Sequence, residues 1–161
     1  MKFLYLLLFA IVSTSVNGQE IKINPDTGMF ESQGVVEIEG KTQDELYSSA
    51  LEWIALNYAS ANDVIQLQDK ASGKIVVKGS FPSTMFKKRG SIPHTLRLEF
   101  KDNRFRYTYS NLSYYSTGSG DMSFEGSMYR KEKIITSAEE DIRNSIQSIK
   151  NFIQKEDSED W

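Results

Sequence analysis

Two stretches that alternate apolar and polar residues constrain this chain most. Apolar side chains occupy every second position in residues 96–100 and again in residues 105–109, on either side of the pair Asp102–Asn103. A period of two puts the apolar side chains of a strand on one face and the polar ones on the other. The sequence therefore predicts an antiparallel hairpin over residues 94–112, with one face packed and the other in water.

Two further segments carry the spacing of amphipathic helices. Apolar residues recur every three or four positions in residues 42–61 and in residues 137–153. Thr42 with Glu45, and Ser137 with Glu140, fit the capping box, in which a hydroxyl and an acid three residues later satisfy free N–H groups at a helix start. Each helix is predicted to begin at its box and to bury one stripe.

Three more strands complete the pattern. A β-branched run ends at Gly40, and residues 64–68 and 74–81 flank a loop whose Gly73 tolerates a positive φ. The Gly- and Ser-rich residues 113–127 are predicted to form a surface loop. The expected fold class is α+β: a two-layer sandwich with a mainly antiparallel sheet of about five strands and two helices packed on one face, in the order β-α-β-β-β-β-α.

The N-terminus has the pattern of a signal peptide. Lys2 precedes an apolar run over residues 3–12, which is shorter than the roughly 20 residues that span a bilayer. We expect residues 1–18 to be a leader cleaved before Gln19, and the product to be exported, periplasmic or secreted; a short membrane anchor is the alternative. No later apolar run has membrane length. The absence of cysteine argues against a lipoprotein and against a disulfide scaffold.

The rest of the chain divides into three parts. Residues 19–33 contain the turn sequence "NPDTG" and are expected to form a loose arm or a short edge strand. Residues 34–154 form the α+β domain, and residues 155–161 an acidic C-terminal tail.

Few residues are suited to catalysis. His94 is the sole histidine and there is no cysteine, so no ordinary zinc or copper site and no cofactor is expected; after Pro93, we expect His94 to be exposed or at a sheet edge. No G-x-S-x-G motif occurs. Acid pairs at residues 44–45 and 139–141 fall in the predicted first helical turns, where the helix dipole explains them. Gly40 stands alone, so its corner is not a phosphate loop.

One region is strongly basic. From Lys74 to Arg106 the chain has nine Lys or Arg residues against Glu99 and Asp102, a local charge of +7. If the apolar residues of these strands point inward, the basic ones point outward. The candidate binding residues are Lys74, Lys78, Lys87, Lys88, Arg89, Arg97, Arg104 and Arg106. The competing interpretation is a solvated strand face whose charges discourage edge pairing.

These segments resemble a known family. The V-x-x-x-G-x-x-x-x-E-L-Y pattern that begins at Val36, the D-x-x-x-G-x-I hairpin that begins at Asp69, and the hairpin over residues 94–112 are similar to a domain of unknown function with a TBP-like fold, which is frequent in exported proteins of Bacteroidetes-type bacteria. The resemblance runs from about Pro25 to Ile153. It implies the fold and no activity, and a fold shared with a DNA-binding protein does not imply DNA binding.

The sequence therefore favours a non-catalytic binding module of the bacterial envelope. Its partner would be an anionic envelope component, a peptide or a glycan, since the leader argues against nucleic acid. One alternative is a hydrolase with a sheet-side cleft near Arg97, Glu99 and Tyr109. Another is a structural subunit of an envelope assembly, which would self-associate.

Overall fold

The computed structural model describes residues 20–58, 60–83 and 90–155. In chain order the elements are β1 (Lys22–Ile23), β2 (Phe30–Glu37), α1 (Gln43–Asn57), α2 (Ala61–Val64), β3 (Ile65–Asp69), β4 (Lys74–Ser83), β5 (Gly90–Lys101), β6 (Arg104–Ser110), β7 (Ser113–Ser116), β8 (Gly120–Ser123) and α3 (Lys131–Lys155). The predicted signal peptide and the acidic tail after Lys155 lie outside these residues.

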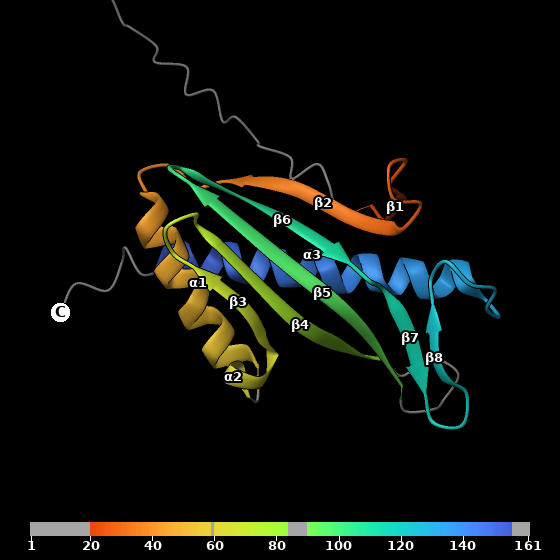
Figure 1. Ribbon diagram of the computed structural model, residues 1–161. Helices are drawn as coiled ribbons and strands as arrows, with labels where there is room; N and C mark the ends of the chain where they lie inside the picture. Colours follow the sequence, from red (N-terminus) through yellow and green to blue (C-terminus); the bar gives the residue numbers. More distant parts are fainter. Residues whose placement is uncertain (1–19, 59, 84–89, 156–161) are drawn as a thin grey trace, which may run out of the picture.

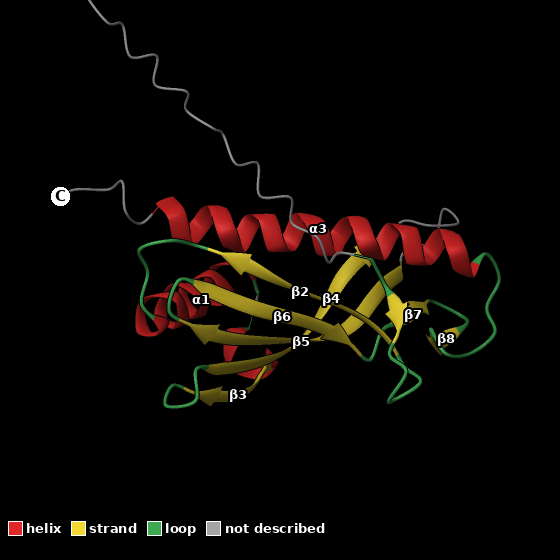
Figure 2. Ribbon diagram, turned by 90° about the horizontal axis from the view of Figure 1, so that it is seen from above, coloured by secondary structure: helices red, strands yellow, loops and turns green. Residues whose placement is uncertain are grey.

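The strands form one antiparallel sheet in the order β1-β2-β6-β5-β4-β3, and β7 and β8 extend it beside the start of β5. The two long helices, α1 and α3, lie on the same side of the sheet (Figures 1 and 2). The predicted two-layer α+β class is confirmed, with eight strands in place of about five. We call the helix side of the sheet its inner face and the opposite side its outer face.

The prediction of a surface loop over residues 113–127 is wrong, because this stretch contains the β7–β8 hairpin. Ser113, Tyr114 and Ser116 are buried. The strands are four residues each and bury serines, so they lack the aliphatic alternation by which strands are found in a sequence. For residues 19–33 the alternative of a short edge strand holds in part, since β1 lies at the edge of the sheet; β2 then begins at Phe30, and Ser32 pairs with Tyr109.

The inner face and the two helices share one core. Leu46, Ala50 and Ile54 of α1 are fully buried, and so are Ile142 and Ile149 of α3. Each fully buried Leu or Ile side chain contributes about 1.5–3 kcal/mol relative to exposure. This apolar seam fixes which face of the sheet the helices cover and leaves the outer face to solvent.

The predicted start of α1 is confirmed. The Thr42 hydroxyl accepts a hydrogen bond from the Glu45 N–H at 3.3 Å, and the Glu45 carboxylate accepts one from the Thr42 N–H at 2.8 Å. The backbone N–H and then the hydroxyl of Thr42 lower the pKa of the Glu45 carboxyl. The capping box therefore ends the Gly40 corner, as the sequence indicates.

The predicted start of α3 is wrong. The helix begins at Lys131, so Ser137 and Glu140 lie inside it, as do the acids at 139–141. Ile134 and Ala138 are buried and carry the apolar stripe back beyond the apparent capping box, because burial outweighs the local signal. Glu139 has a structural partner, since its carboxylate accepts a hydrogen bond from the Ile21 N–H at 2.9 Å. Burial, and then the charge of Glu140, raise the pKa of the Asp141 carboxyl.

Replacing Tyr109 by phenylalanine is expected to destabilise the protein, whereas replacing Tyr107 is not, because only the Tyr109 hydroxyl makes a hydrogen bond within the described chain. The Tyr109 hydroxyl donates to Ser145 Oγ at 2.8 Å, whereas the buried Tyr107 hydroxyl has no hydrogen-bond partner in the described chain. In urea denaturation, Tyr109→Phe should lose about 1 kcal/mol, and Tyr107→Phe should be neutral or stabilising. Equal losses in the two variants would show that the Tyr107 hydroxyl is paired, for example by water.

Candidate anion-binding site

The outer face of the sheet arranges charged side chains in rows across the strands. Strand register places Val35, Arg106, Glu99, Lys74 and Asp69 side by side, in that order from β2 to β3. Side chains opposite each other in neighbouring strands are close enough to interact directly. Basic and acidic residues thus alternate along most of this row.

A second row lies at the end of the same strands. Glu37, Arg104 and Lys101 stand opposite one another on β2, β6 and β5. Acids therefore reach this face from β2 and β3, which lie outside the basic segment 74–106. The local charge of +7 counted along the sequence overstates the charge of the face, and part of it forms the solvated, internally compensated surface that was the competing interpretation.

Between these two rows the outer face has a pocket of about 320 Å³. It is lined by Val35, Ser72, Lys74, Glu99, Phe100, Lys101, Arg104 and Arg106. Four of these residues are basic and one is acidic, so the lining has a net charge of +3. This pocket brings together basic residues of β4, β5 and β6.

Ion pairing accounts for only one of the four cations. Glu99 Oε2 accepts from Arg106 Nη2 at 2.7 Å and from Arg106 Nε at 2.9 Å. Within the described chain, Lys74, Lys101 and Arg104 have no carboxylate within 4.0 Å. Asp69, although opposite Lys74 in the ladder, accepts hydrogen bonds from the N–H and hydroxyl of Ser72 instead, and these lower the pKa of its carboxyl.

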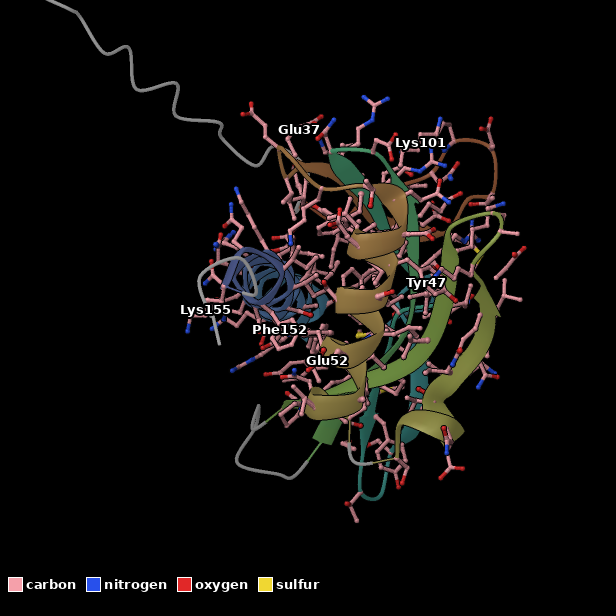
Figure 3. The ribbon with its side chains drawn as sticks, turned by 90° about the vertical axis from the view of Figure 1, so that its left-hand side faces the viewer. Glu37, Tyr47, Glu52, Lys101, Phe152 and Lys155 are labelled. Atoms are coloured by element: carbon pink, nitrogen blue, oxygen red, sulfur yellow. The ribbon has the colours of Figure 1, made fainter. Side chains whose placement is uncertain are left out.

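The turn between β5 and β6 holds two of these cations in place. Asn103 has a φ of 64°, and its side-chain oxygen accepts from the Gly40 N–H at 2.8 Å. Asp102 Oδ1 accepts from the Gln43 N–H, also at 2.8 Å. The turn is therefore bonded to the start of α1, and Lys101 lies at that end of the sheet in Figure 3. Lys101 precedes this anchored turn and Arg104 follows it, so the backbone that carries both pocket side chains is held in place.

The residues of the hydrolase alternative do not share a cleft. Arg97 and Glu99 lie on the outer face, whereas Tyr109 is fully buried on the inner face and bonded to Ser145 of α3. A sheet separates the phenol from the other two groups, because residues with opposite parity point to opposite faces. The expectation of a sheet-side cleft formed by Arg97, Glu99 and Tyr109 is therefore wrong.

The expectation that His94 is exposed is wrong, whereas the alternative of an edge position agrees with the absence, in the described chain, of a paired strand on one side of β5 at residues 92–94. His94 lies inside β5, faces the core and is only 4 % exposed. The strand begins four residues before it, at Gly90, and includes Pro93. Proline fits there because β6 pairs with β5 only from Thr95 onwards and β7 only up to Ser91, so no neighbouring strand on that side needs the missing N–H.

The family described as "Domain of unknown function (DUF4468) with TBP-like fold" matches residues 33–115, just over half of the chain. The chain belongs to this family. The matched segment includes every residue that lines the outer-face pocket, while α3 lies beyond it.

Two crystal structures show the same fold. A TBP-like protein from Parabacteroides distasonis has a TM-score of 0.70 at 14 % identity, over 82 % of this chain and 97 % of that one. A DUF4468 family protein from Bacteroides ovatus has a TM-score of 0.58 at 13 % identity, over 83 % and 92 % of the two chains. No curated protein matches the chain. At these identities the likeness concerns the fold alone, which agrees with the family resemblance seen in the sequence.

The eight candidate binding residues do not lie at one place on this fold. Lys74, Arg104 and Arg106 line the pocket, and Arg97 stands on the same face in the next row. Lys78 is four residues from Lys74, about 13 Å farther along β4. The other three, at positions 87–89, lie outside the described residues.

Five of the eight lining residues were absent from the sequence-based candidates: Val35, Ser72, Glu99, Phe100 and Lys101. Lys101 has the same outward parity as Arg97, and could have been included on that signal. Val35 of β2 is 45 % exposed, but no sequence pattern shows that β2 lies beside β6. In the described chain no group of three or more His, Cys, Asp or Glu side chains is placed to hold a metal. None of the described helices combines the length and the apolar character that crossing a membrane requires.

Proposed function

We propose that this protein is a non-catalytic binding module of the bacterial envelope, and that its outer-face pocket holds a carboxylate or phosphate group of the ligand. One observation carries the proposal. Four basic side chains from β4, β5 and β6 line a single pocket of about 320 Å³, and its one carboxylate is bonded to Arg106.

The chemistry of the lining suits an anion. Arg104 can offer two parallel N–H groups to a carboxylate or phosphate, and Lys74 and Lys101 add two point charges. Glu99 fixes the Arg106 guanidinium, which leaves its remaining N–H groups as oriented donors. The exposed side chain of Val35 at the rim offers an apolar contact to the part of the ligand that carries the anion.

The envelope location is part of the proposal. It is supported by the leader pattern of residues 1–18, by the lack of cysteine, and by the bacterial origin of the two related structures. An anionic envelope polymer, an acidic peptide and an acidic glycan all present the group that the pocket is suited to bind.

Charge removal at the pocket is expected to abolish binding of small polyanions. The protein, labelled with ¹⁵N, is titrated with citrate and with inorganic tripolyphosphate, and amide shifts are followed by NMR. Saturable shifts should occur at residues 101–106. The variant Lys74→Ala/Lys101→Ala/Arg104→Ala should bind at least about tenfold more weakly, because three charge-assisted hydrogen bonds are removed.

The matched control removes the same charges from the outside of α3. Lys133→Ala/Arg143→Ala/Lys150→Ala loses two lysines and one arginine of α3, which lies on the opposite side of the sheet from the pocket. It should bind both polyanions as the unaltered protein does. If the two triple variants weaken binding equally, the interaction reflects net charge alone and the pocket is not the site.

A further inference from the structure

The second surface of interest lies among the helices, on the other side of the sheet from the anion pocket. Between the C-terminal halves of α1 and α3 runs a groove of about 440 Å³, within the size range of small-molecule sites. It is lined by Trp53, Asn57, Asn144, Gln147, Ser148, Asn151, Phe152 and Lys155. Figure 3 looks onto this region, with Phe152 at the junction of the two helices and Lys155 near the end of α3.

On the solvent side of α3 the exposed positions become uncharged where the groove begins, and the charge within this stretch is that of the half-buried Lys150. In the first half of the helix the exposed positions are mostly charged: Glu132, Lys133, Thr136, Glu140 and Arg143. From position 144 to position 154 every exposed residue is an uncharged amide or alcohol: Asn144, Gln147, Ser148, Asn151 and Gln154. Lys155 is the one charged residue of the groove lining in the described chain, and it stands at the groove's end.

Intrinsic helix propensity does not favour these residues, although the hydrogen bond from Gln147 to Asn151, four residues on, offsets part of the cost. Asn and Ser are poor helix formers in a helix interior, where their short polar side chains compete for backbone hydrogen bonds. Asn144 and Asn151 are both exposed and lie well inside α3, so neither caps the helix nor fills the core. Asn144 has no such compensating bond in the described chain, and a local preference broken without an evident gain is typical of a functional surface.

The polar groups of the groove are partly oriented and partly available. Gln147 Nε2 donates to Asn151 Oδ1 at 2.8 Å, which leaves the Asn151 amino group as a donor. Asn57 Nδ2 donates to the Trp53 carbonyl at 2.8 Å, which leaves the Asn57 side-chain oxygen as an acceptor. Trp53 Nε1 donates to Ser148 Oγ at 3.0 Å and so ties the indole to α3.

We propose that this groove binds a neutral oligosaccharide. Amides and hydroxyls each donate and accept hydrogen bonds, which matches a ligand covered with hydroxyl groups. The half-buried ring of Phe152 offers an apolar surface to the C–H face of a sugar ring. A charged ligand would find one cation and no carboxylate among the lining residues, and a peptide would find no deep apolar pocket for an anchor side chain.

The site is separate from the anion pocket and does not rest on it. The two differ in charge, in the elements that form them and in the face of the sheet on which they lie. An envelope polymer that carries both neutral sugars and acidic groups could engage both, but each site is tested by itself.

Titration with uncharged sugars tests the proposal directly. Chitotetraose, cellotetraose and mannotetraose are added separately to ¹⁵N-labelled protein. For at least one of them, saturable shifts are expected in the side-chain NH₂ signals of Asn57, Asn144 and Asn151. In a Trp161→Phe background, Trp53 is the remaining indole, so its fluorescence gives a second readout from inside the groove.

Replacing the two exposed asparagines should lower the affinity for the sugar about tenfold, which is the loss expected for two amide hydrogen bonds. Asn144→Ala/Asn151→Ala places a strong helix former at both positions, so the melting temperature should be unchanged or higher and unfolding cannot cause the loss. The control Thr136→Ala/Gln154→Ala alters two exposed polar positions of α3 outside the groove lining and should bind normally.

Three outcomes would overturn the proposal. The first is that none of the three sugars would give saturable shifts at the groove. The second is that the double asparagine variant would bind sugar as well as the unaltered protein does. The third is that a neutral Gly-Ser-Asn peptide would bind there and the sugars would not. The variant Lys74→Ala/Lys101→Ala/Arg104→Ala should keep full sugar affinity. Its result separates a failure of this groove from a failure of the anion pocket.

Discussion

Lowering the pH from 7 to 4 is expected to cost the folded protein about 3 kcal/mol of unfolding free energy through His94 alone. The imidazole is 4 % exposed, and its Nδ1–H donates to the Ile92 carbonyl at 3.0 Å. Its Nε2 atom has no hydrogen-bond partner in the described chain. Burial lowers the pKa of His94 to about 4, against an ordinary value of 6.5, and the bond to Ile92 offsets this only in part.

The direction follows from proton binding. Between pH 6.5 and 4 the unfolded chain binds a proton at His94 that the folded chain does not, so acid stabilises the unfolded state and stability falls as pH falls. Above about pH 8, where neither state binds this proton, His94 adds no pH dependence to the unfolding free energy. The hydroxyls of Tyr58 and Tyr109 near the ring stay protonated throughout, because burial raises the pKa of both phenols, that of Tyr58 to about 12.

The measurement is urea denaturation at pH 7, 6, 5 and 4, for the protein and for His94→Phe. The phenylalanine keeps a ring between Phe81 and Tyr109 but loses the bond to Ile92, so it should be less stable at pH 7 by about 1 kcal/mol. Carboxyl groups titrate in both proteins and cancel in the difference. The gap should close and then reverse in acid. Parallel curves would mean that His94 is solvated in the folded state.

Much of the fold was predictable, because its long helices and strands have clear patterns in their own local sequence. The β5–β6 hairpin has a strict period of two, and α1 has both a cap and an apolar stripe. The errors fall where local and tertiary signals differ. Ser137 and Glu140 have the spacing of a cap, but Ile134 and Ala138 before them are buried, so α3 begins earlier. His94 is polar, yet the centroid of its ring lies 4.2 Å from the centroid of the Phe81 ring, within the core.

The candidate site was predictable in part for the same reason. Parity along β5 and β6 places Arg97, Arg104 and Arg106 on the outer face, and the structure agrees. The charge of that face was not predictable, since Glu37 and Asp69 reach it from strands whose neighbours only the sheet order reveals. The helix groove was missed because Trp53 and Asn144 are far apart in the sequence, and neither alone forms a motif.

Gly34→Ala is expected to destabilise the protein by about 2 kcal/mol, a large effect for one added methyl group. Gly34 pairs with Tyr107 across β2 and β6, on the inner face. An added Cβ would stand 2.6 Å from the Tyr107 hydroxyl oxygen and 2.9 Å from Cζ, closer than side chains tolerate. Alanine also restricts the unfolded chain, which returns about 0.4–1 kcal/mol. The steric term should be larger, because Tyr107 is fully buried and its ring can shift only by displacing packed neighbours.

A double-mutant cycle identifies the contact as the cause. Tyr107→Leu removes the hydroxyl and Cζ, so Gly34→Ala should cost clearly less in that background than in the unaltered protein. Tyr107→Phe should relieve only part of the cost, since the 2.9 Å contact with Cζ stays. The glycine and tyrosine are thus one unit, in which the ring covers a residue with no side chain of its own and closes the core beneath β2. Equal costs of Gly34→Ala in all three backgrounds would instead locate the strain in the backbone of β2.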